Sequence, residues 1–323
     1  MKRVAIVLLQ LLVTGAGLWY VFHDQQKRAE IADALRHADR TWILFGWLSY
    51  SVVEVLATVR WQMLLRIQGI TLHWLRTFAI VMMGLFFNMF LPGLVGGDAM
   101  RLYFVFKYAP RQKTRATLSV AMDRIFGMLS ILFLAGLSVA VRFHWLNRSA
   151  AALHIVYLVV ALLAVGSICV VSFFGAVHFG LLRKLSNRTP FRPAIIESGK
   201  ALQLYGKHPG VMSVAFMITV VAHLVYYLSY YCAAESFPGA RAAGLSLTDI
   251  LSIMPLVNTV TALPVSFGGV GVRETLFQEL LGNLAHVPPA IAAVSASLGF
   301  VIQASWGLLG AAVFLVSQKI TRR

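Results

Sequence analysis

The sequence predicts an all-α polytopic membrane protein, and three observations lead to this prediction. Hydrophobic residues make up 59% of the 323 residues and charged residues only 12%, whereas soluble domains carry about 25% charged residues. Several apolar runs reach the roughly 20 residues that a helix needs to cross the hydrocarbon core of a bilayer. These runs lack the alternation of polar and apolar residues that marks transmembrane β-strands.

Six apolar runs are long enough to be full spans. They are Val4–Phe22, Trp42–Leu65, Ala116–Val141, Ala152–Phe179, Val211–Ala234 and Pro289–Ser317. The first run follows Lys2 and Arg3, as in a signal peptide, but it is long enough to span and has no clear small-residue cleavage site. We therefore expect it to be the first membrane helix.

The positive charges predict the orientation of these spans. Lys and Arg are concentrated in residues 2–3, 66–76, 107–115, 183–207 and 319–323, whereas residues 24–40, 142–148 and 241 are balanced or poorer in positive charge. The positive-inside rule places the first set in the cytoplasm, with both termini, in a bacterial inner membrane. Because the basic residues flank apolar runs, orientation explains the formal charge of +16 better than nucleic-acid binding does.

Two further apolar segments, His73–Tyr108 and Thr248–Leu284, are interrupted near the middle by Pro and several Gly. The charge pattern places both ends of the first segment in the cytoplasm and both ends of the second outside. We therefore expect two re-entrant hairpins that enter the membrane from opposite faces.

The two interrupted segments also repeat one motif. Leu91-Pro92-x-x-x-Gly96-Gly97-x-x-x-Arg101 matches Leu263-Pro264-x-x-x-Gly268-Gly269-x-x-x-Arg273 at an offset of 172 residues. The single integral membrane domain, residues 1–323, would then divide into residues 1–148 with hairpin 73–108 and residues 149–323 with hairpin 248–284. Because the halves begin on opposite sides, the sequence predicts an inverted-topology repeat.

The repeated motif also predicts a binding site. A Pro and a Gly-Gly pair within the membrane free backbone groups, which are tolerated only beside protein or a wet cavity. Helix N-termini favour anions, and an Arg guanidinium binds phosphate in a bidentate way. The candidate binding residues are Gly96, Gly97, Arg101, Gly268, Gly269 and Arg273. The alternative is that the arginines extend to the interface and the glycines allow close helix packing.

Other polar residues within the apolar runs are also candidates, because such residues are costly in a membrane. Asp98 and Glu274, beside the interruptions, would either couple an ion or proton or pair with the arginines. Asp123 and Arg124 in the third span are predicted to face the site. Glu54, Arg60 and His223 are either site residues or polar contacts between helices. Four tyrosines, at 226, 227, 230 and 231, are expected to form an interfacial aromatic belt.

Enzyme signatures are scarce in this sequence. It contains no His-Glu-x-x-His, Gly-x-Ser-x-Gly or Walker motif, and its His residues lack metal-ligand spacing. We therefore expect no catalytic residues, no metal and no cofactor. A glycosyl transferase that uses the external acidic residues Asp24, Asp33 and Asp39 is the enzymatic alternative, but these residues alternate with bases as on a solvated helix.

Three motifs carry a resemblance to a known family. They are Phe87-Asn88-x-Phe90-Leu91-Pro92-Gly93-x-x-Gly96-Gly97-Asp98-x-x-Arg101, then Asp123-Arg124-x-x-Gly127, then Gly268-Gly269-Val270-Gly271-x-x-Glu274. Together they resemble the lysylphosphatidylglycerol synthase transmembrane family, although many relatives have Glu where this chain has Asp123. The resemblance implies movement of a lipid between leaflets, with Arg101, Asp98, Arg273 and Glu274 lining the site. Some relatives are linked to hopanoid and polyprenyl-lipid pathways.

The leading hypothesis is therefore a lipid translocase, or flippase, whose partner is a membrane lipid with an anionic headgroup. One alternative is a small-solute channel or carrier, because six spans with two opposed hairpins is also the aquaporin plan. Neither hairpin carries Asn-Pro-Ala, however, and each carries an Arg, which suits an anion better. The other alternative is a non-transporting partner of a lipid biosynthetic enzyme.

Overall fold

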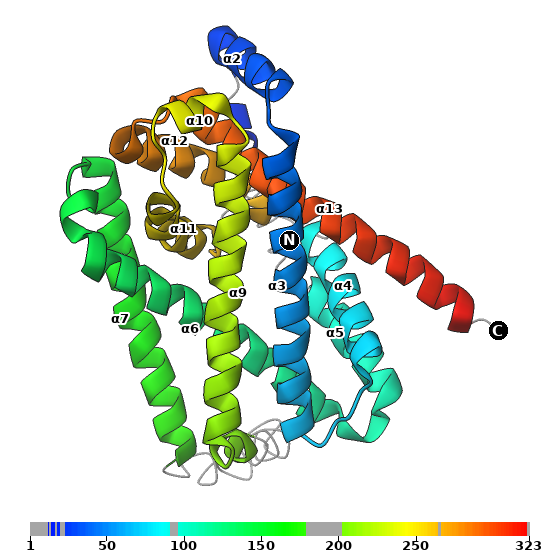
Figure 1. Cartoon of the computed structure of the whole chain (residues 1–323). Coiled ribbons are helices and arrows are strands. Elements are labelled where there is room, and N and C mark those ends of the chain that lie inside the picture. The colour runs from blue at the N-terminus through cyan, green and yellow to red at the C-terminus, as the bar shows by residue number, and fades with distance from the viewer. Residues whose placement is uncertain are drawn as a thin grey trace.

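The computed structural model describes residues 23–90, 96–178, 202–263 and 266–321, and scattered positions between 12 and 19. The regular elements of this described part are all helical, which confirms the all-α prediction. The principal helices in chain order are α2 (Gln25–Arg36), α3 (Arg40–Ile67), α4 (Trp74–Phe90), α5 (Gly96–Tyr108), α6 (Lys113–Leu146), α7 (Ala150–His178), α9 (Pro209–Glu235), α10 (Pro238–Ala242), α11 (Leu247–Thr261), α12 (Val272–Ala285) and α13 (Pro289–Thr321) (Figure 1).

Four stretches of helix in the described part are long and apolar enough to cross a membrane: Arg40–Ile67, Pro110–Leu146, Pro209–Glu235 and Pro289–Val316. They match four of the six predicted spans. The first predicted span, Val4–Phe22, lies mostly outside the described residues. The fourth matches α7, whose described apolar stretch, Ala152–Ile168, is shorter than these four.

Local sequence signals explain where several of these helices begin. Asp39 caps α3, because its carboxylate accepts the backbone N–H of Thr41 at 2.9 Å. The same hydrogen bond lowers the pKa of Asp39, which favours a negative charge at the positive end of the helix. Ser246 and Asp249 form a reciprocal capping box at the start of α11. Pro209 begins α9 at a position where the missing N–H has no helical partner.

The two interrupted segments each form a pair of short helices. At a rise of about 1.5 Å per residue, the 13 residues of α5 and the 14 residues of α12 extend only about 20 Å, less than the roughly 30 Å of hydrocarbon. Residues 91–95, with Pro92 and Gly93, lie outside the described part, as do Pro264 and Val265. The second interruption is described from Ser266 onward, where Gly268, Gly269 and Gly271 all have positive φ.

Close helix packing holds the short pairs within the bundle. α3 lies along α9 at the centre of the bundle, α4 packs against α5 and α13, and α12 packs against α13. α4 and α5 lie in the lower half of Figure 1, whereas α11 and α12 lie in the upper half. Gly310 of α13 allows the α4 contact, since a Cβ there would meet the carbonyl oxygen of Met82.

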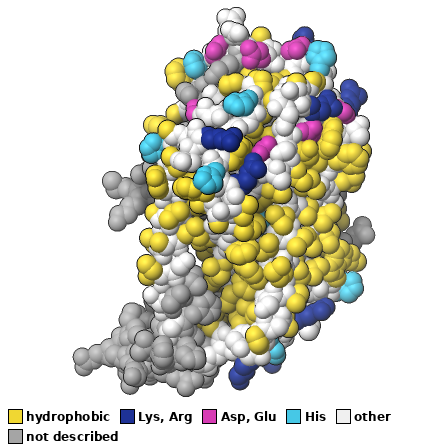
Figure 2. Space-filling model, turned by 60° about the vertical axis from the view of Figure 1, so that its left-hand side comes forward, with side chains coloured by type: hydrophobic (Ala, Val, Ile, Leu, Met, Phe, Trp, Pro, Cys, Tyr) yellow, Lys and Arg dark blue, Asp and Glu magenta, His cyan; other side chains and the backbone are white. Residues whose placement is uncertain are grey.

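The surface has the polarity expected of a membrane protein. Figure 2 shows hydrophobic side chains across the middle of one face, with charged side chains gathered towards its two ends. Large apolar side chains are exposed on several long helices, among them Leu48 on α3, Phe133 on α6, Met217 on α9 and Leu308 on α13. Such a wide apolar surface would be unfavourable in water and is suited to lipid.

Candidate functional site

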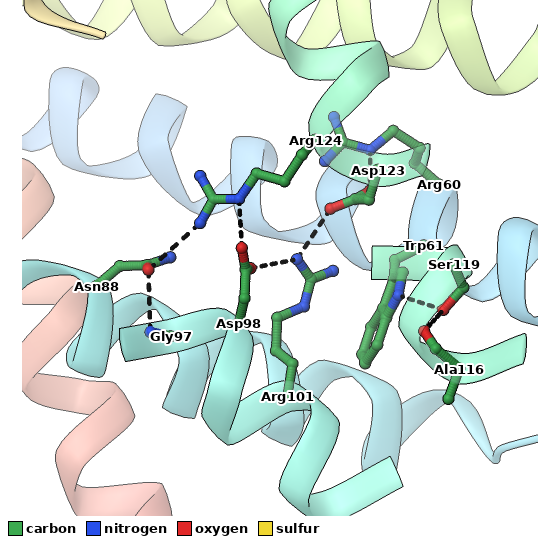
Figure 3. Close-up of polar contacts among 10 residues, drawn as sticks. All are labelled: Arg60, Trp61, Asn88, Gly97, Asp98, Arg101, Ala116, Ser119, Asp123 and Arg124. Carbon is green, nitrogen blue, oxygen red and sulfur yellow. Dashed lines mark hydrogen bonds and ion pairs between the residues drawn. The ribbon is translucent and has the colours of Figure 1, made fainter. Parts of the chain in front are cut away.

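The candidate site begins with a network of charged side chains where α5 meets α3 and α6. Asp123 of α6 accepts hydrogen bonds from Nε of Arg60 at 2.7 Å and from a terminal nitrogen of Arg101 at 2.9 Å (Figure 3). The Asp123 side chain is only 4% exposed. Because two guanidinium groups share this buried carboxylate, Asp123 joins α3, α5 and α6 at one point.

A second aspartate extends the network to the first interruption. Asp98, in the first turn of α5, accepts a hydrogen bond from Nε of Arg124 at 2.7 Å and lies 3.7 Å from Arg101. Arg124 also donates to the side-chain oxygen of Asn88 at 3.3 Å, and the same oxygen accepts the backbone N–H of Gly97 at 3.0 Å. These contacts connect the end of α4, the start of α5 and the middle of α6 (Figure 3).

The network carries an excess of positive charge and has an aromatic wall. Three arginines, at 60, 101 and 124, face two aspartates, so these five groups sum to one positive charge. The Arg101 guanidinium lies 4.0 Å from the ring centre of Trp61, a cation–π distance. Trp61 is itself fixed by its indole N–H, which donates to the Ser119 hydroxyl at 3.3 Å. Arg124 is the most accessible member, with 43% of its side chain exposed.

The second interruption holds Arg273 in a different environment. Its side chain is 5% exposed, and one terminal nitrogen donates to the carbonyl oxygen of Gly268 at 3.0 Å. The guanidinium lies 5.2 Å from the ring centre of Phe300 and 5.8 Å from that of Tyr230. Its Nε and other terminal nitrogen have no hydrogen-bond partner among the described residues. Arg273 is therefore a buried cation with two nitrogens available to additional acceptors.

Glu274 is next to Arg273 but is used within its own helix start. Its carboxylate accepts the backbone N–H of Gly271 at 2.6 Å and the Ser297 hydroxyl at 3.4 Å. Gly269, with φ of 77°, allows Arg273 to approach, since a Cβ on Gly269 would lie 2.9 Å from the guanidinium. The geometry thus places Gly268, Gly269, Arg273 and Glu274 together around the second interruption.

The helix N-termini differ from the sequence-based expectation of unpaired N–H groups that await an anion. At α5 the Gly97 N–H already bonds to Asn88, and Asp98 places a negative charge in the first turn. Before α12 the Gly271 N–H already bonds to Glu274. Side chains of the protein therefore occupy one donor at each site, so the arginines are the stronger candidates for anion contacts.

Comparison with known proteins identifies the family. The family model described as the lysylphosphatidylglycerol synthase TM region matches residues 7–313, nearly the whole chain. The chain belongs to this family. The resemblance of the three sequence motifs is thereby confirmed. Among individual relatives, a UPF0104 membrane protein of Methanothermobacter thermautotrophicus is 23% identical over 90% of this chain and 91% of its own length. Another UPF0104 membrane protein, from Methanocaldococcus jannaschii, is 25% identical over 41% of this chain and 38% of its own length.

In this member of the lysylphosphatidylglycerol synthase TM family, the predicted site residues fall into two groups. Gly96, Gly97, Asp98, Arg101, Asp123 and Arg124 gather at the first interruption, and the remaining four gather at the second. Arg60, considered in the sequence as either a site residue or a helix contact, is a direct partner of Asp123. His223 instead lies within hydrogen-bonding distance of the Ser130 hydroxyl.

The prediction of an interfacial tyrosine belt was wrong for two of its four members. Tyr227 and Tyr230 are completely buried, and Tyr230 is one of the rings beside Arg273. Their spacing along α9 could not reveal this, because α9 packs on α3, α11 and α13 rather than facing lipid on all sides. The sequence also missed Trp61 and Phe300 as partners of the arginines. An aromatic residue in an apolar run carries no signal of such a role.

Proposed function

We propose that this protein is a lipid translocase that moves a lipid with an anionic headgroup between the leaflets of a bacterial inner membrane. The substrate class includes anionic phospholipids and polyprenyl or hopanoid-type lipids. Two lines support the proposal: the name of the family refers to the membrane region of a lysylphosphatidylglycerol synthase, and two buried arginines, Arg101 and Arg273, lie beside the interruptions of the apolar segments. We propose no chemical reaction for the protein.

The observation that carries the proposal is the environment of Arg273. A buried guanidinium is costly in a membrane, and a structure that retains one usually has a functional use for it. Two of its nitrogens are unpartnered within the described part of the chain, and aromatic rings stabilise its charge. Two oxygens of a phosphate group would supply the missing acceptors in the bidentate geometry that arginine favours.

The network at the first interruption would act as a clamp in the same cycle. Asp123 and Asp98 hold Arg101 in place, and the more exposed Arg124 would make the first contact with a headgroup. Breaking these ion pairs would let α5 and α6 separate and would open a path for the headgroup between them. Re-forming the ion pairs would close this path. Lipid tails would remain in the bilayer while the headgroup moves past the arginines.

An inverted-topology repeat would explain how the protein alternates access between the two leaflets. The order α3, α4, α5, α6 is followed by α9, α11, α12, α13, and each later helix begins about 170 residues after its counterpart. In our proposal each short pair is a re-entrant hairpin, the pairs enter from opposite faces, and six spans surround them. Rocking of one half against the other would expose the arginines to each leaflet in turn.

The experiment that tests the proposal uses purified protein in liposomes that contain a fluorescent phosphatidylglycerol or, separately, fluorescent phosphatidylcholine. A membrane-impermeant reductant quenches only the outer-leaflet label, so flipping increases the quenched fraction beyond that of protein-free liposomes. We expect protein-dependent flipping of the anionic lipid and loss of at least about tenfold in rate for Arg273→Gln. Arg36→Gln, on exposed α2, is the matched control and should flip lipid normally.

Two outcomes would contradict this function. Osmotic swelling with a small solute but no lipid flipping would support a channel or carrier of aquaporin-like plan. Inactive purified protein that becomes active only as a complex with a lipid biosynthetic enzyme would support a role as a non-transporting partner.

A further inference from the structure

Four carboxylates lie buried or nearly buried near the two interruptions, and one differs from the other three. Asp98 and Asp123 each bind two arginines, and Glu274 accepts the Gly271 N–H and the Ser297 hydroxyl. Glu54 of α3 is 5% exposed, and its direct side-chain hydrogen bond is with the Tyr50 hydroxyl. In the part of the chain that the structure describes, neither Glu54 nor Glu274 forms an ion pair with a Lys, Arg or His, but Glu274 has two hydrogen-bond donors and Glu54 has one.

The charged groups around Glu54 connect it to the clamp. Arg60 on the same helix and Arg101 on α5 both interact electrostatically with Glu54, although both bind Asp123 directly. Of the other helices packed on α3, α4 and α13 have one ionisable residue each, Arg76 and Lys319, near their ends. α6 contributes Asp123 and Arg124, and α9 contributes His223, which interacts electrostatically with Arg60, and the tyrosines discussed next. Asp123 therefore binds both arginines directly, and Glu54 lies within electrostatic range of the same two arginines.

The hydroxyl partner of Glu54 connects it to Arg273. The Tyr50 ring packs edge-on against Tyr226 at 6.1 Å between ring centres, and the Tyr226 hydroxyl donates to that of Tyr230 at 3.3 Å. Tyr230 is one of the rings beside Arg273. A change of charge at Glu54 would thus act on Arg101 in one direction and, through Tyr50, Tyr226 and Tyr230, on Arg273 in the other direction.

A buried carboxylate of this kind has two accessible states. Ionised, it attracts Arg60 and Arg101 and weakens their hold on Asp123. Protonated, it is neutral, and both arginines remain with Asp123. The protonation state of Glu54 would therefore set the strength of the clamp.

We propose that Glu54 is a proton-binding site through which a pH gradient drives lipid translocation. This inference rests on the proposed function and adds its coupling ion. The step consists of proton transfer from water on one side to the carboxylate and later release on the other side, with no other bond formed or broken. A metal cation fits less well, because it needs several oxygen ligands and would be repelled by Arg60 and Arg101. The described residues also contain no group of three or more His, Cys, Asp or Glu that could hold a metal ion.

The test compares wild type with Glu54→Gln in liposomes that contain fluorescent phosphatidylglycerol and an internal pH indicator. With equal pH on both sides, both proteins should exchange the lipid between leaflets, but Glu54→Gln more slowly, because its neutral side chain leaves both arginines on Asp123. With a pH gradient, wild type should accumulate lipid in one leaflet and move protons with it. In Glu54→Gln, the rate of lipid accumulation and the rate of proton movement should each be at least about tenfold lower than in wild type. Glu30→Gln, which removes an exposed carboxylate on α2, is the matched control and should behave as wild type.

Tyr50→Phe provides a second variant that keeps the carboxylate and the ring but removes the hydroxyl. Because the variant removes the hydrogen-bond partner of the Glu54 carboxylate, the pH dependence of driven transport should change although Glu54 is retained. Replacing Na⁺ by K⁺ should leave the wild-type rate unchanged. An infrared carbonyl band from a protonated carboxyl, measured on purified protein, should titrate with pH in wild type and be absent in Glu54→Gln. This last measurement does not depend on transport.

Each alternative result has a distinct meaning. Wild type that flips lipid with no response to pH, or Glu54→Gln that keeps gradient-driven accumulation, would overturn the proton site and leave the translocase intact. Correctly folded Glu54→Gln that no longer exchanges lipid even at equal pH would assign Glu54 a structural role and also overturn it. Wild type that flips no lipid under any condition would contradict the proposed function itself.

Discussion

Arg101 and Asp123 form a buried ion pair with 2.9 Å between a guanidinium nitrogen and a carboxylate oxygen. The corresponding arginine of the repeated motif, Arg273, bonds instead to a backbone carbonyl and lies beside two aromatic rings. Two residues at equal positions in one motif therefore have different electrostatic partners. This difference leads to separate expectations for stability and for transport.

Replacement of Asp123 by Asn should destabilise the protein strongly. The change leaves Arg60 and Arg101 buried without their shared negative charge, and breaking a buried pair in this way costs about 3–5 kcal/mol. Thermal unfolding in detergent measures the effect. Asp33→Asn is the control, because that aspartate is 72% exposed on α2 and its loss should change stability by less than about 0.5 kcal/mol. Equal unfolding temperatures for Asp123→Asn and wild type would show that the network contributes little.

Replacement of the two motif arginines by Gln should affect stability unequally. Arg101→Gln removes an ion-pair partner of Asp123 and should lower stability by about 3 kcal/mol. Arg273→Gln removes a buried cation that has no described carboxylate partner, so stability should change by less than about 1 kcal/mol while flipping falls. Unfolding curves and flipping rates are measured on the same preparations. Similar losses of stability in both variants would contradict the electrostatic difference.

Arg273→Lys tests whether the planar guanidinium matters. Lysine keeps the charge but presents a single ammonium, so a bidentate phosphate contact is lost and we expect flipping to fall about tenfold. The liposome assay above measures this rate. Near-normal flipping by Arg273→Lys would remove the bidentate contact from the mechanism.

Gly97 should be intolerant of alanine, unlike a second helical glycine. A Cβ on Gly97 would overlap the carbonyl oxygen of Gly84 and the Asn88 amide, so α4 and α5 would have to separate, at a cost of about 1–3 kcal/mol. A Cβ on Gly127 of α6 would meet nothing within 4 Å, and alanine there should stabilise the helix by up to about 1 kcal/mol. Thermal unfolding of the two variants is the comparison, and equal effects would argue against tight packing of α4 on α5.

The proposed orientation can be tested with single cysteines at two exposed positions. After replacement of Cys169 and Cys232, Lys207→Cys should react with an impermeant thiol reagent only in permeabilised cells, because residues 183–207 are predicted to be cytoplasmic. Arg148→Cys, in the connection between α6 and α7, should react in intact cells. Labelling of Lys207→Cys in intact cells would reverse the predicted orientation.

The sequence alone determined the class of the protein and the location of its unusual segments. The length and composition of apolar runs are local properties of the sequence. They predicted all four described stretches of helix that are long enough to cross a membrane, and also the two segments that break into short helices. The spacing of Gly, Pro, Asp and Arg in three motifs was enough to identify the family. The duplicated motif also marked Arg101 and Arg273 as residues to examine.

Only the tertiary structure decided which groups neutralise each charge. Arg60 and Asp123 are 63 positions apart in the chain, and the partners of Arg273 come from α9 and α13 as well as from its own turn. From the sequence, the two motif arginines are predicted to have equivalent roles, because the spacing of the motif residues around them is identical. The electrostatic free energies of the two arginines differ because the burial and the ion pairs of each side chain depend on the helices packed around it. Helix packing brings together residues that are far apart in the sequence, so no local pattern predicts these contacts.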